Sequence, residues 1–327
     1  MKKILVFLLI GISNQLVTAQ YTDIINSKRP GFSESPYGIG KNVYQLETDF
    51  FYRSSDNLSY YDKPSTFGTS MNIRVGQFLE KLEMNANITY QNDEIQAIAG
   101  PNYNHYGISD FSLGVKYLIF QKEFTDKSKE IRSWVKRTSY DSKRYIPSVG
   151  IYAGVHTNFL VNDSFLQKDA FIEGNNYEDG MSYKGALLLQ NDFTDRFVVL
   201  TNLIADRITS DNEFYSYIIT ATYAVNQNWS FFAENQGKYK KKYSPEYQIG
   251  GGLAYLISPN LQLDISARTN FFDNYSYVYA STGFAWRLDR HQDEKIQKEK
   301  PKAKNLRKNK KSALKRLFQK KYKKKKM

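Results

Sequence analysis

Cysteine is missing from all 327 residues of the chain. Disulfide bonds, thiolate catalysis, Cys-ligated zinc or iron–sulfur sites and a lipid-modified N-terminal cysteine are therefore excluded. Long hydrophobic runs are missing too, because no apolar stretch beyond the first 20 residues approaches the roughly 20 residues of a membrane helix. Histidine is scarce, with three residues, and no metal-ligand spacing occurs, so we expect neither a metal nor another cofactor.

Aromatic residues are abundant instead, at 15% of the chain with 26 Tyr and 21 Phe, a composition that favours strands over helices. The mean hydropathy of −0.58 is low for a membrane protein built of helices. It is compatible with a transmembrane β-barrel, whose strands alternate apolar residues facing lipid with polar residues facing the lumen.

The N-terminus resembles a secretory signal peptide. Lys2 and Lys3 precede the apolar residues 4–12, and Val17-Thr18-Ala19 offers a small-residue cleavage site. We predict a cleaved signal peptide over 1–19, with an uncleaved anchor as the alternative.

The basic charge is concentrated in a C-terminal tail. Residues 291–327 hold 17 Lys and Arg and 3 acidic residues, a surplus above the net charge of +13 for the whole chain. We predict a disordered periplasmic tail whose partners would be anionic lipid head groups, acidic cell-wall components or a protein. Residues 307–324 could form a basic amphipathic helix on a membrane surface. The compartment argues against nucleic acid, and a solvated tail without a single partner is the alternative.

Strict alternation of apolar and polar residues begins at residue 43. In 66–76, for example, Phe67, Ile73 and Val75 alternate with Asn72 and Arg74, and a period of two over about ten residues is typical of a half-buried strand. We predict an all-β fold, a twelve-stranded antiparallel transmembrane β-barrel over 43–290. Its strands are expected at 43–53, 66–76, 80–91, 107–120, 145–159, 183–193, 197–208, 214–225, 229–240, 247–258, 261–271 and 277–288.

The connections support this topology. Short turns are expected at 77–79, 194–196, 226–228 and 258–260, and longer outer loops at 54–65, 91–106 and 160–182. The stretch 121–144 does not fit, because it is long yet falls on the periplasmic side. It is either an excursion, with a short helix around 130–135, or a missed pair of strands. Aromatic residues near strand ends, Phe50, Phe51 and Trp286 among them, would lie in interface girdles.

The polar face of the strands carries charges of both signs. In a pore such charges set selectivity, and the alternative is a closed interior filled with salt bridges. A soluble sandwich or lipocalin-like barrel fits poorly, because its interior would have to hold these groups. The lumen-lining candidates are Glu47, Asp49, Arg74, Lys81, Glu83, Asp110, Lys116, Glu234, Asp264, Arg268 and Arg287.

The segment Ser27-Lys28-Arg29-Pro30-Gly31-Phe32-Ser33-Glu34-Ser35-Pro36, followed by Val43-Tyr44-Gln45-Leu46-Glu47, resembles the opening of a family of outer-membrane barrels. The family is named for the MetA pathway of phenol degradation and is common in Bacteroidetes. The resemblance extends more loosely to 145–150. It implies a barrel and suggests the passage of small hydrophobic or aromatic molecules.

Residues 20–42 form a leader before the first predicted strand, and the Pro and Gly residues of 21–42 favour neither helix nor strand. We expect Arg29, Pro30, Glu34 and Pro36 to form a plug or gate, with Arg29 and Glu34 paired to the charged wall. The alternative is a disordered periplasmic leader.

The sequence therefore predicts a non-enzymatic channel in the outer membrane of a Gram-negative bacterium, for passive uptake or efflux of small molecules. A scaffolding barrel whose tail binds cell-wall, lipid or secretion-system partners is the alternative. A membrane esterase using His156 is the least favoured, since His156-Thr157-Asn158 lacks the adjacent Ser-Asn-Gly of the barrel phospholipases. His105 is expected in an outer loop.

Overall fold

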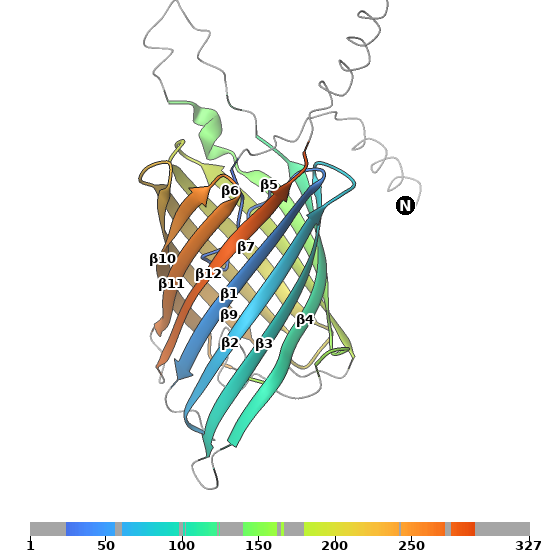
Figure 1. Ribbon diagram of the computed structural model, residues 1–327, viewed down its shortest axis with the longest axis vertical. Helices are drawn as coiled ribbons and strands as arrows, with labels where there is room; N and C mark the ends of the chain where they lie inside the picture. The colour runs from blue at the N-terminus through green and yellow to red at the C-terminus, as the bar shows by residue number, and fades with distance from the viewer. Residues whose placement is uncertain are drawn as a thin grey trace, which may run out of the picture. The chain divides into compact units, whose positions relative to one another are not determined.

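The computed structural model describes residues 24–55, 61–97, 101, 103–122, 124, 140–161, 165–166, 180–241, 243–271 and 276–291. Twelve antiparallel strands close into a barrel in which each strand pairs with its sequence neighbours and β1 pairs with β12 (Figure 1). The predicted twelve-stranded barrel is confirmed. The strands are β1 (Val43–Ser55), β2 (Tyr61–Gly76), β3 (Leu82–Ala97), β4 (Tyr103–Phe120), β5 (Ser148–Thr157), β6 (Met181–Asp192), β7 (Phe197–Ile208), β8 (Phe214–Ala224), β9 (Trp229–Lys240), β10 (Glu246–Ser258), β11 (Leu261–Phe271) and β12 (Tyr277–Asp289).

The barrel has two distinct ends. We call the end where β1 begins the turn end, since tight connections at 77–81, 193–196, 225–228 and 259–260 lie there. We call the opposite end the loop end. It has one long connection, 158–180, but also short ones at 209–213 and 241–245, so the loops are less asymmetric than predicted.

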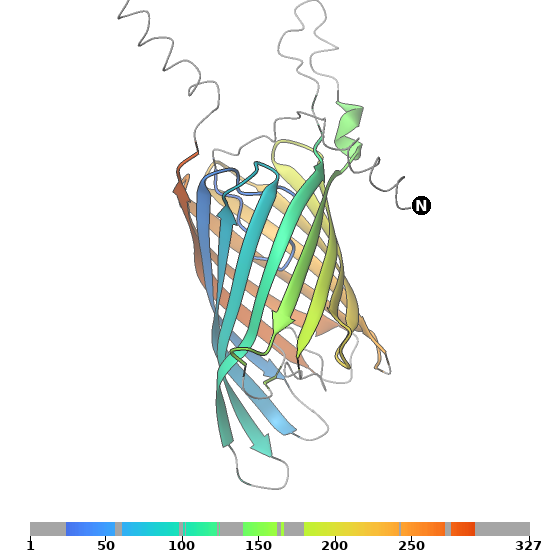
Figure 2. The same cartoon turned by 90° about the vertical axis from the view of Figure 1, so that its right-hand side faces the viewer.

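Strands β2, β3 and β4 are longer than predicted and project past the loop end (Figure 2). The expected loops 54–65 and 91–106 are therefore wrong in large part, because strand pairing continues through them. Polar residues such as Asn92 and Glu94 occupy exposed positions there. Beyond the apolar belt, these strands keep their backbone hydrogen bonds, but their outward positions are mostly polar.

The connection 121–144 adds no strand to the barrel, because β4 pairs directly with β5. The suggestion of a missed strand pair within the barrel is thus wrong. A short 3-10 helix, η1 (Ser142–Tyr145), precedes β5. The helix expected around 130–135 lies outside the described residues.

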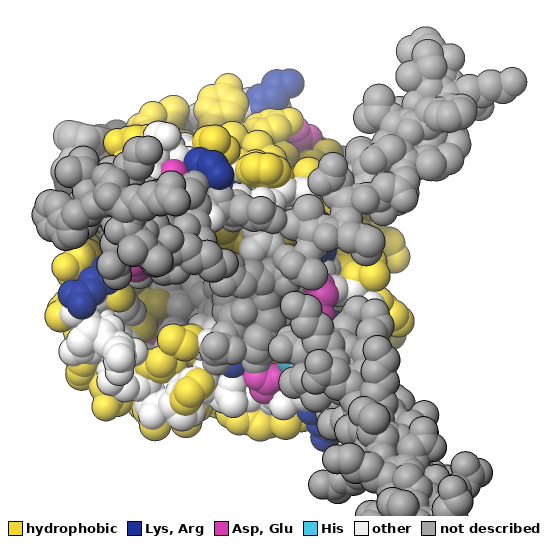
Figure 3. Space-filling model, turned by 90° about the horizontal axis from the view of Figure 1, so that it is seen from above, with side chains coloured by type: hydrophobic (Ala, Val, Ile, Leu, Met, Phe, Trp, Pro, Cys, Tyr) yellow, Lys and Arg dark blue, Asp and Glu magenta, His cyan; other side chains and the backbone are white. Residues whose placement is uncertain are grey.

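The burial pattern is inverted relative to a soluble protein. Buried side chains of β1 include Gln45, Glu47 and Asp49, whereas Phe50 is 48% exposed. Apolar side chains are distributed around the outer circumference (Figure 3). A protein folded in water would not expose such a continuous apolar belt, which removes the soluble alternative. The expectation that Phe51 lies in an interface girdle is wrong. Its side chain is 1% exposed and stacks on Tyr279 inside the barrel.

The predicted signal peptide and nearly all of the basic tail lie outside the described residues. Residues 290–327 form a separate unit, of which the structure describes 290–291. In the described part of the chain, no helix is long and apolar enough to cross a membrane.

Candidate functional site: the barrel interior

Residues 24–42, the described part of the leader, lie within the barrel near its turn end (Figure 2). The leader has no helix or strand of its own, so its backbone N–H groups need other partners. Carboxylates from separate strands provide them. The N–H of Phe32 donates to Glu234 on β9 (3.0 Å), that of Ile39 to Glu83 on β3 (3.1 Å) and that of Lys28 to Glu47 on β1 (3.2 Å).

Arg29 binds two carboxylates on the side of the barrel where β1, β11 and β12 meet. Its Nη2 lies 2.5 Å from Asp264 Oδ1 on β11, and its Nη1 lies 3.1 Å from Asp49 Oδ2 on β1. All three side chains are largely buried. A buried charge is tolerated only when it is paired in this way.

Glu34 binds the opposite side of the barrel. Its Oε1 lies 3.1 Å from Nζ of Lys116 on β4, and its backbone exchanges two hydrogen bonds with the side chain of Asn202 on β7. Burial alone would raise the pKa of this carboxyl, but the charges of Lys116, Lys28 and Arg74 outweigh burial and lower the pKa to about 2. Glu34 is therefore ionised at neutral pH.

A buried network joins the wall beside the leader. Arg74 on β2 binds Glu83 (2.7 Å) and Glu47 (2.8 Å), and Lys116 lies 3.2 Å from Glu83. Two carboxylates thus compensate two cations, and Lys116 also holds the leader through Glu34. The network leaves little net charge on this side of the lumen.

Phe32 anchors the leader to an aromatic and cationic corner. The guanidinium of Arg268 on β11 lies 3.6 Å from the centroid of the Phe32 ring, and the centroid of the Tyr279 ring lies 5.5 Å from it. Arg268 also pairs with Glu234, which accepts the leader's N–H groups. One carboxylate therefore serves both the wall and the leader.

The prolines of the leader make close contacts. Pro36 packs against Gly150 of β5 so tightly that a Cβ at Gly150 would come within 2.9 Å of the Pro36 Cβ. Pro30 lines an internal cavity together with Arg29 and Glu34. Pro36 therefore lies where only a glycine in the wall gives it room.

A family model matches residues 27–288, which covers most of the leader and all but the last residue of β12. Its description is "Putative MetA-pathway of phenol degradation". The chain belongs to this family. The resemblance carried by the Arg-Pro and Glu-Ser-Pro residues of the leader is thus confirmed at the level of the family.

Solved structures of outer-membrane channels and porins are among those similar to this chain. An outer-membrane channel from Pseudomonas putida is similar at a TM-score of 0.53 and 8% identity, over 80% of this chain and 100% of that one. The CymD monoaromatic hydrocarbon channel matches at a TM-score of 0.37 and 12% identity, over 77% of this chain and 90% of that one. The KdgM porin matches at a TM-score of 0.41 and 9% identity, over 74% of this chain and 99% of that one. At such identities the likeness concerns the fold alone. No curated protein matches the chain in sequence.

A second charged cluster lies beyond the leader on β4, β5, β6 and β7. Nδ1 of His156 lies 2.9 Å from Asp110 and Nε2 lies 2.9 Å from Asp206. Lys184 pairs with Asp206 at 2.6 Å and Arg207 with Asp110 at 3.3 Å. Both imidazole nitrogens are therefore engaged by carboxylates, so this histidine is not placed to activate a serine as an esterase requires.

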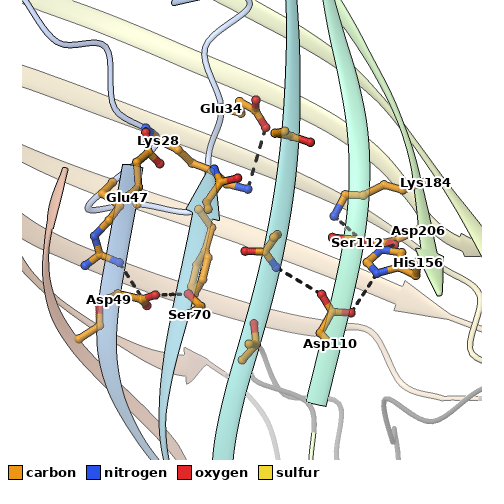
Figure 4. A pocket seen from close by; sticks show the side chains of 18 of the residues that line it. Lys28, Glu34, Glu47, Asp49, Ser70, Asp110, Ser112, His156, Lys184 and Asp206 are labelled. Carbon is orange, nitrogen blue, oxygen red and sulfur yellow. Dashed lines mark hydrogen bonds and ion pairs between the residues drawn. The ribbon is translucent and has the colours of Figure 1, made fainter. Parts of the chain in front are cut away.

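Between the leader and this cluster lies a cavity of about 220 Å³, which we call the chamber (Figure 4). The leader contributes Lys28, Arg29 and Glu34 to its lining, and β4 and β5 contribute Asp110 and His156. The volume is that of a small solute, below the roughly 300–1,000 Å³ of pockets that hold drug-sized ligands.

Not every predicted lumen residue joins this interior. Lys81 lies in the turn before β3, half-buried, because the strand begins one residue later at Leu82. Arg287 is buried on β12 near the turn end, bonded to Asn260 and paired with Asp289. His105 lies in β4, with its ring 4.3 Å from that of Phe165, so its expected place in an outer loop is wrong.

Other predicted residues are brought together in the interior. Glu47, Asp49, Glu83, Lys116, Glu234, Asp264 and Arg268 lie within reach of the leader or of its partners. Sequence reasoning missed Asn202, Lys184, Asp206 and Arg207 as site residues. Asn202 and Asp206 interrupt an otherwise apolar strand, and that irregularity was the available sign.

Proposed function

We propose that this barrel is an outer-membrane channel of a Gram-negative bacterium, through which small molecules diffuse passively, and that the leader is its gate. The family and the channel-like fold support the coarse function. One observation carries the gate: the leader is bonded to opposite walls at once, with Arg29 on Asp264 and Glu34 on Lys116.

The charged lumen supports a pore in which the passage of solute depends on the leader. Twelve-stranded barrels lie between filled eight-stranded barrels and open sixteen-stranded porins. A segment that crosses the lumen can then decide whether solute passes. Its ion pairs hold it in place, and breaking them would release it.

The passage of hydrophobic or aromatic molecules stays a prediction that rests on the family resemblance. In its favour, Phe32, Phe51 and Tyr279 form an aromatic group next to the chamber. The Bacteroidetes origin likewise stays a prediction.

Planar-bilayer recordings test the gate. We expect a variant lacking residues 21–42, with the signal peptide retained, to conduct several times more current than the wild type. As a control, Arg144→Gln removes a half-buried arginine of η1 that pairs with exposed Asp195 at the turn end, and should conduct like the wild type. Equal, near-zero conductance in the wild type and the deletion variant would contradict the gate.

The scaffolding barrel remains the second candidate, and it depends on the basic tail. Deleting 291–327 separates the two functions. A lost co-purifying partner with unchanged permeability would favour scaffolding.

A further inference from the structure

One wall of the chamber consists of uncharged polar side chains. Asn72 on β2, Asn87 on β3 and Ser112 on β4 are partners in register across three strands, and Thr89 follows on the same inward face of β3. All four line the chamber. These strands therefore present a continuous belt of amide and hydroxyl groups to whatever occupies the cavity.

The belt has hydrogen-bonding capacity to spare. Among the described residues, the buried Oδ1 of Asn72 has no hydrogen-bond partner, whereas Asn87 donates to Asp110. Thr89 and Ser112 add hydroxyl groups to the same lining. Buried polar groups are normally satisfied by protein, water or ligand. The belt is thus suited to a solute that brings its own donors and acceptors.

The charged groups around the chamber are already matched. Arg29 pairs with Asp49 and Asp264. Asp206 pairs with Lys184 (Figure 4). A solute with a net charge would have to compete with these pairs, and breaking a buried pair is costly. An uncharged solute can bind without disturbing them.

A bare hydrocarbon is the poorer match for the same reason. It would displace water from the belt without replacing the hydrogen bonds, which loses affinity. A hydroxylated ring satisfies the belt, and one of its faces can lie against the rings of Phe32 and Tyr279, which also line the chamber.

We propose that the chamber is a binding site for a small, uncharged, polyhydroxylated solute of single-ring size, recognised by the Asn72, Thr89 and Ser112 belt. This inference rests on the proposed channel function, and it names a solute class that differs from the hydrophobic or aromatic molecules suggested by the family resemblance. The belt discriminates by hydrogen bonding, and the volume of about 220 Å³ limits the solute to one ring.

A matched pair of isosteric substitutions tests the belt. Thr89→Val removes a hydroxyl from the chamber, and Thr69→Val removes one from the outward face of β2, where the cross-strand partners of Thr69 are the exposed Phe50 and Tyr90. Binding of D-xylose and of phenol to the full mature chain in detergent micelles is measured by saturation-transfer NMR titration. We expect xylose to bind more tightly than phenol, and Thr89→Val to weaken it by roughly two- to tenfold, the worth of one hydrogen bond. Thr69→Val should leave binding unchanged.

Ser112→Ala removes a second belt hydroxyl and should weaken xylose binding in the same way. This second variant keeps the test valid if one of the two variants has a folding defect. Tighter binding of phenol than of xylose, or equal xylose binding in all variants, would overturn the proposal. Because binding is measured without conduction, this failure is distinct from failure of the gate. A channel that opens when its leader is removed but ignores xylose would refute the binding site alone.

Discussion

At the scale of single residues, Glu34 is the leader group whose ionisation matters most. It is the leader's partner for Lys116, and the surrounding cations hold its pKa at about 2, below its ordinary value. A carboxyl with a lowered pKa stabilises the docked state above its ordinary pKa, and that contribution disappears as the pH falls through the lowered value. Docking through Glu34 should therefore persist in mildly acidic solution.

The prediction is a flat conductance of the wild type between about pH 7 and about pH 4. Glu34→Gln, which keeps the shape but loses the ion pair, should conduct more than the wild type throughout this range. Bilayer recordings at stepped pH give the comparison. A wild-type channel that opens steeply at about pH 5, with no difference from Glu34→Gln below that pH, would show that Glu34 does not hold the leader.

The sequence alone predicted only some of the wall residues that bind the leader. Arg29 and Glu34 stand out because charged residues in a Pro- and Gly-rich segment need partners, and the strand alternation places carboxylates on the inward face. Which carboxylate meets which cation depends on how the leader crosses the lumen, and no local pattern encodes that path. Asn202 is the clearest case, since it binds the leader's backbone from a strand that is mostly apolar.

At the scale of elements, strand existence was predictable and strand ends were not. β7, β9 and β11 begin and end where alternation places them, and a tight turn-end connection directly precedes each of them. β3 continues to Ala97 because pairing with β2 and β4 persists after the apolar face has ended. Phe51 shows the complementary limit: an aromatic residue at a strand end can face inward, where Tyr279 offers a stacking partner.

Strand β4 allows a test of where the membrane lies. Leu113 on its outward face is 49% exposed, and Tyr106, on the part that projects past the loop end, is 71% exposed. Leu113→Arg should destabilise the barrel by roughly 2–4 kcal/mol, the cost of Arg near the middle of a bilayer. Tyr106→Arg, in water, should cost about 0–1 kcal/mol. Urea unfolding in lipid vesicles measures both, and equal costs would contradict the membrane position.

At the scale of the whole molecule, the barrel and its leader form one closed unit. The barrel has its polar side chains inside and its apolar side chains outside. The leader donates hydrogen bonds to the carboxylates of the interior and packs against its aromatic rings. Alternation predicts the barrel from the sequence because lipid and lumen impose a period of two. The fit of the leader arises from contacts between residues as distant as Arg29 and Asp264, so it becomes visible only in the folded chain.

The most direct test of the gate pins the leader to the wall. Because the chain has no cysteine, Pro36→Cys with Gly150→Cys introduces a single possible disulfide. The two Cβ positions lie 2.9 Å apart, so a small outward shift of the leader reaches the roughly 3.5–4.5 Å of a disulfide. Bilayer current is recorded from the oxidised double variant and again after reduction, with the variant lacking 21–42 as the open reference. We predict near-zero current when oxidised and a severalfold rise on reduction. An oxidised channel that conducts like the open reference would contradict the account.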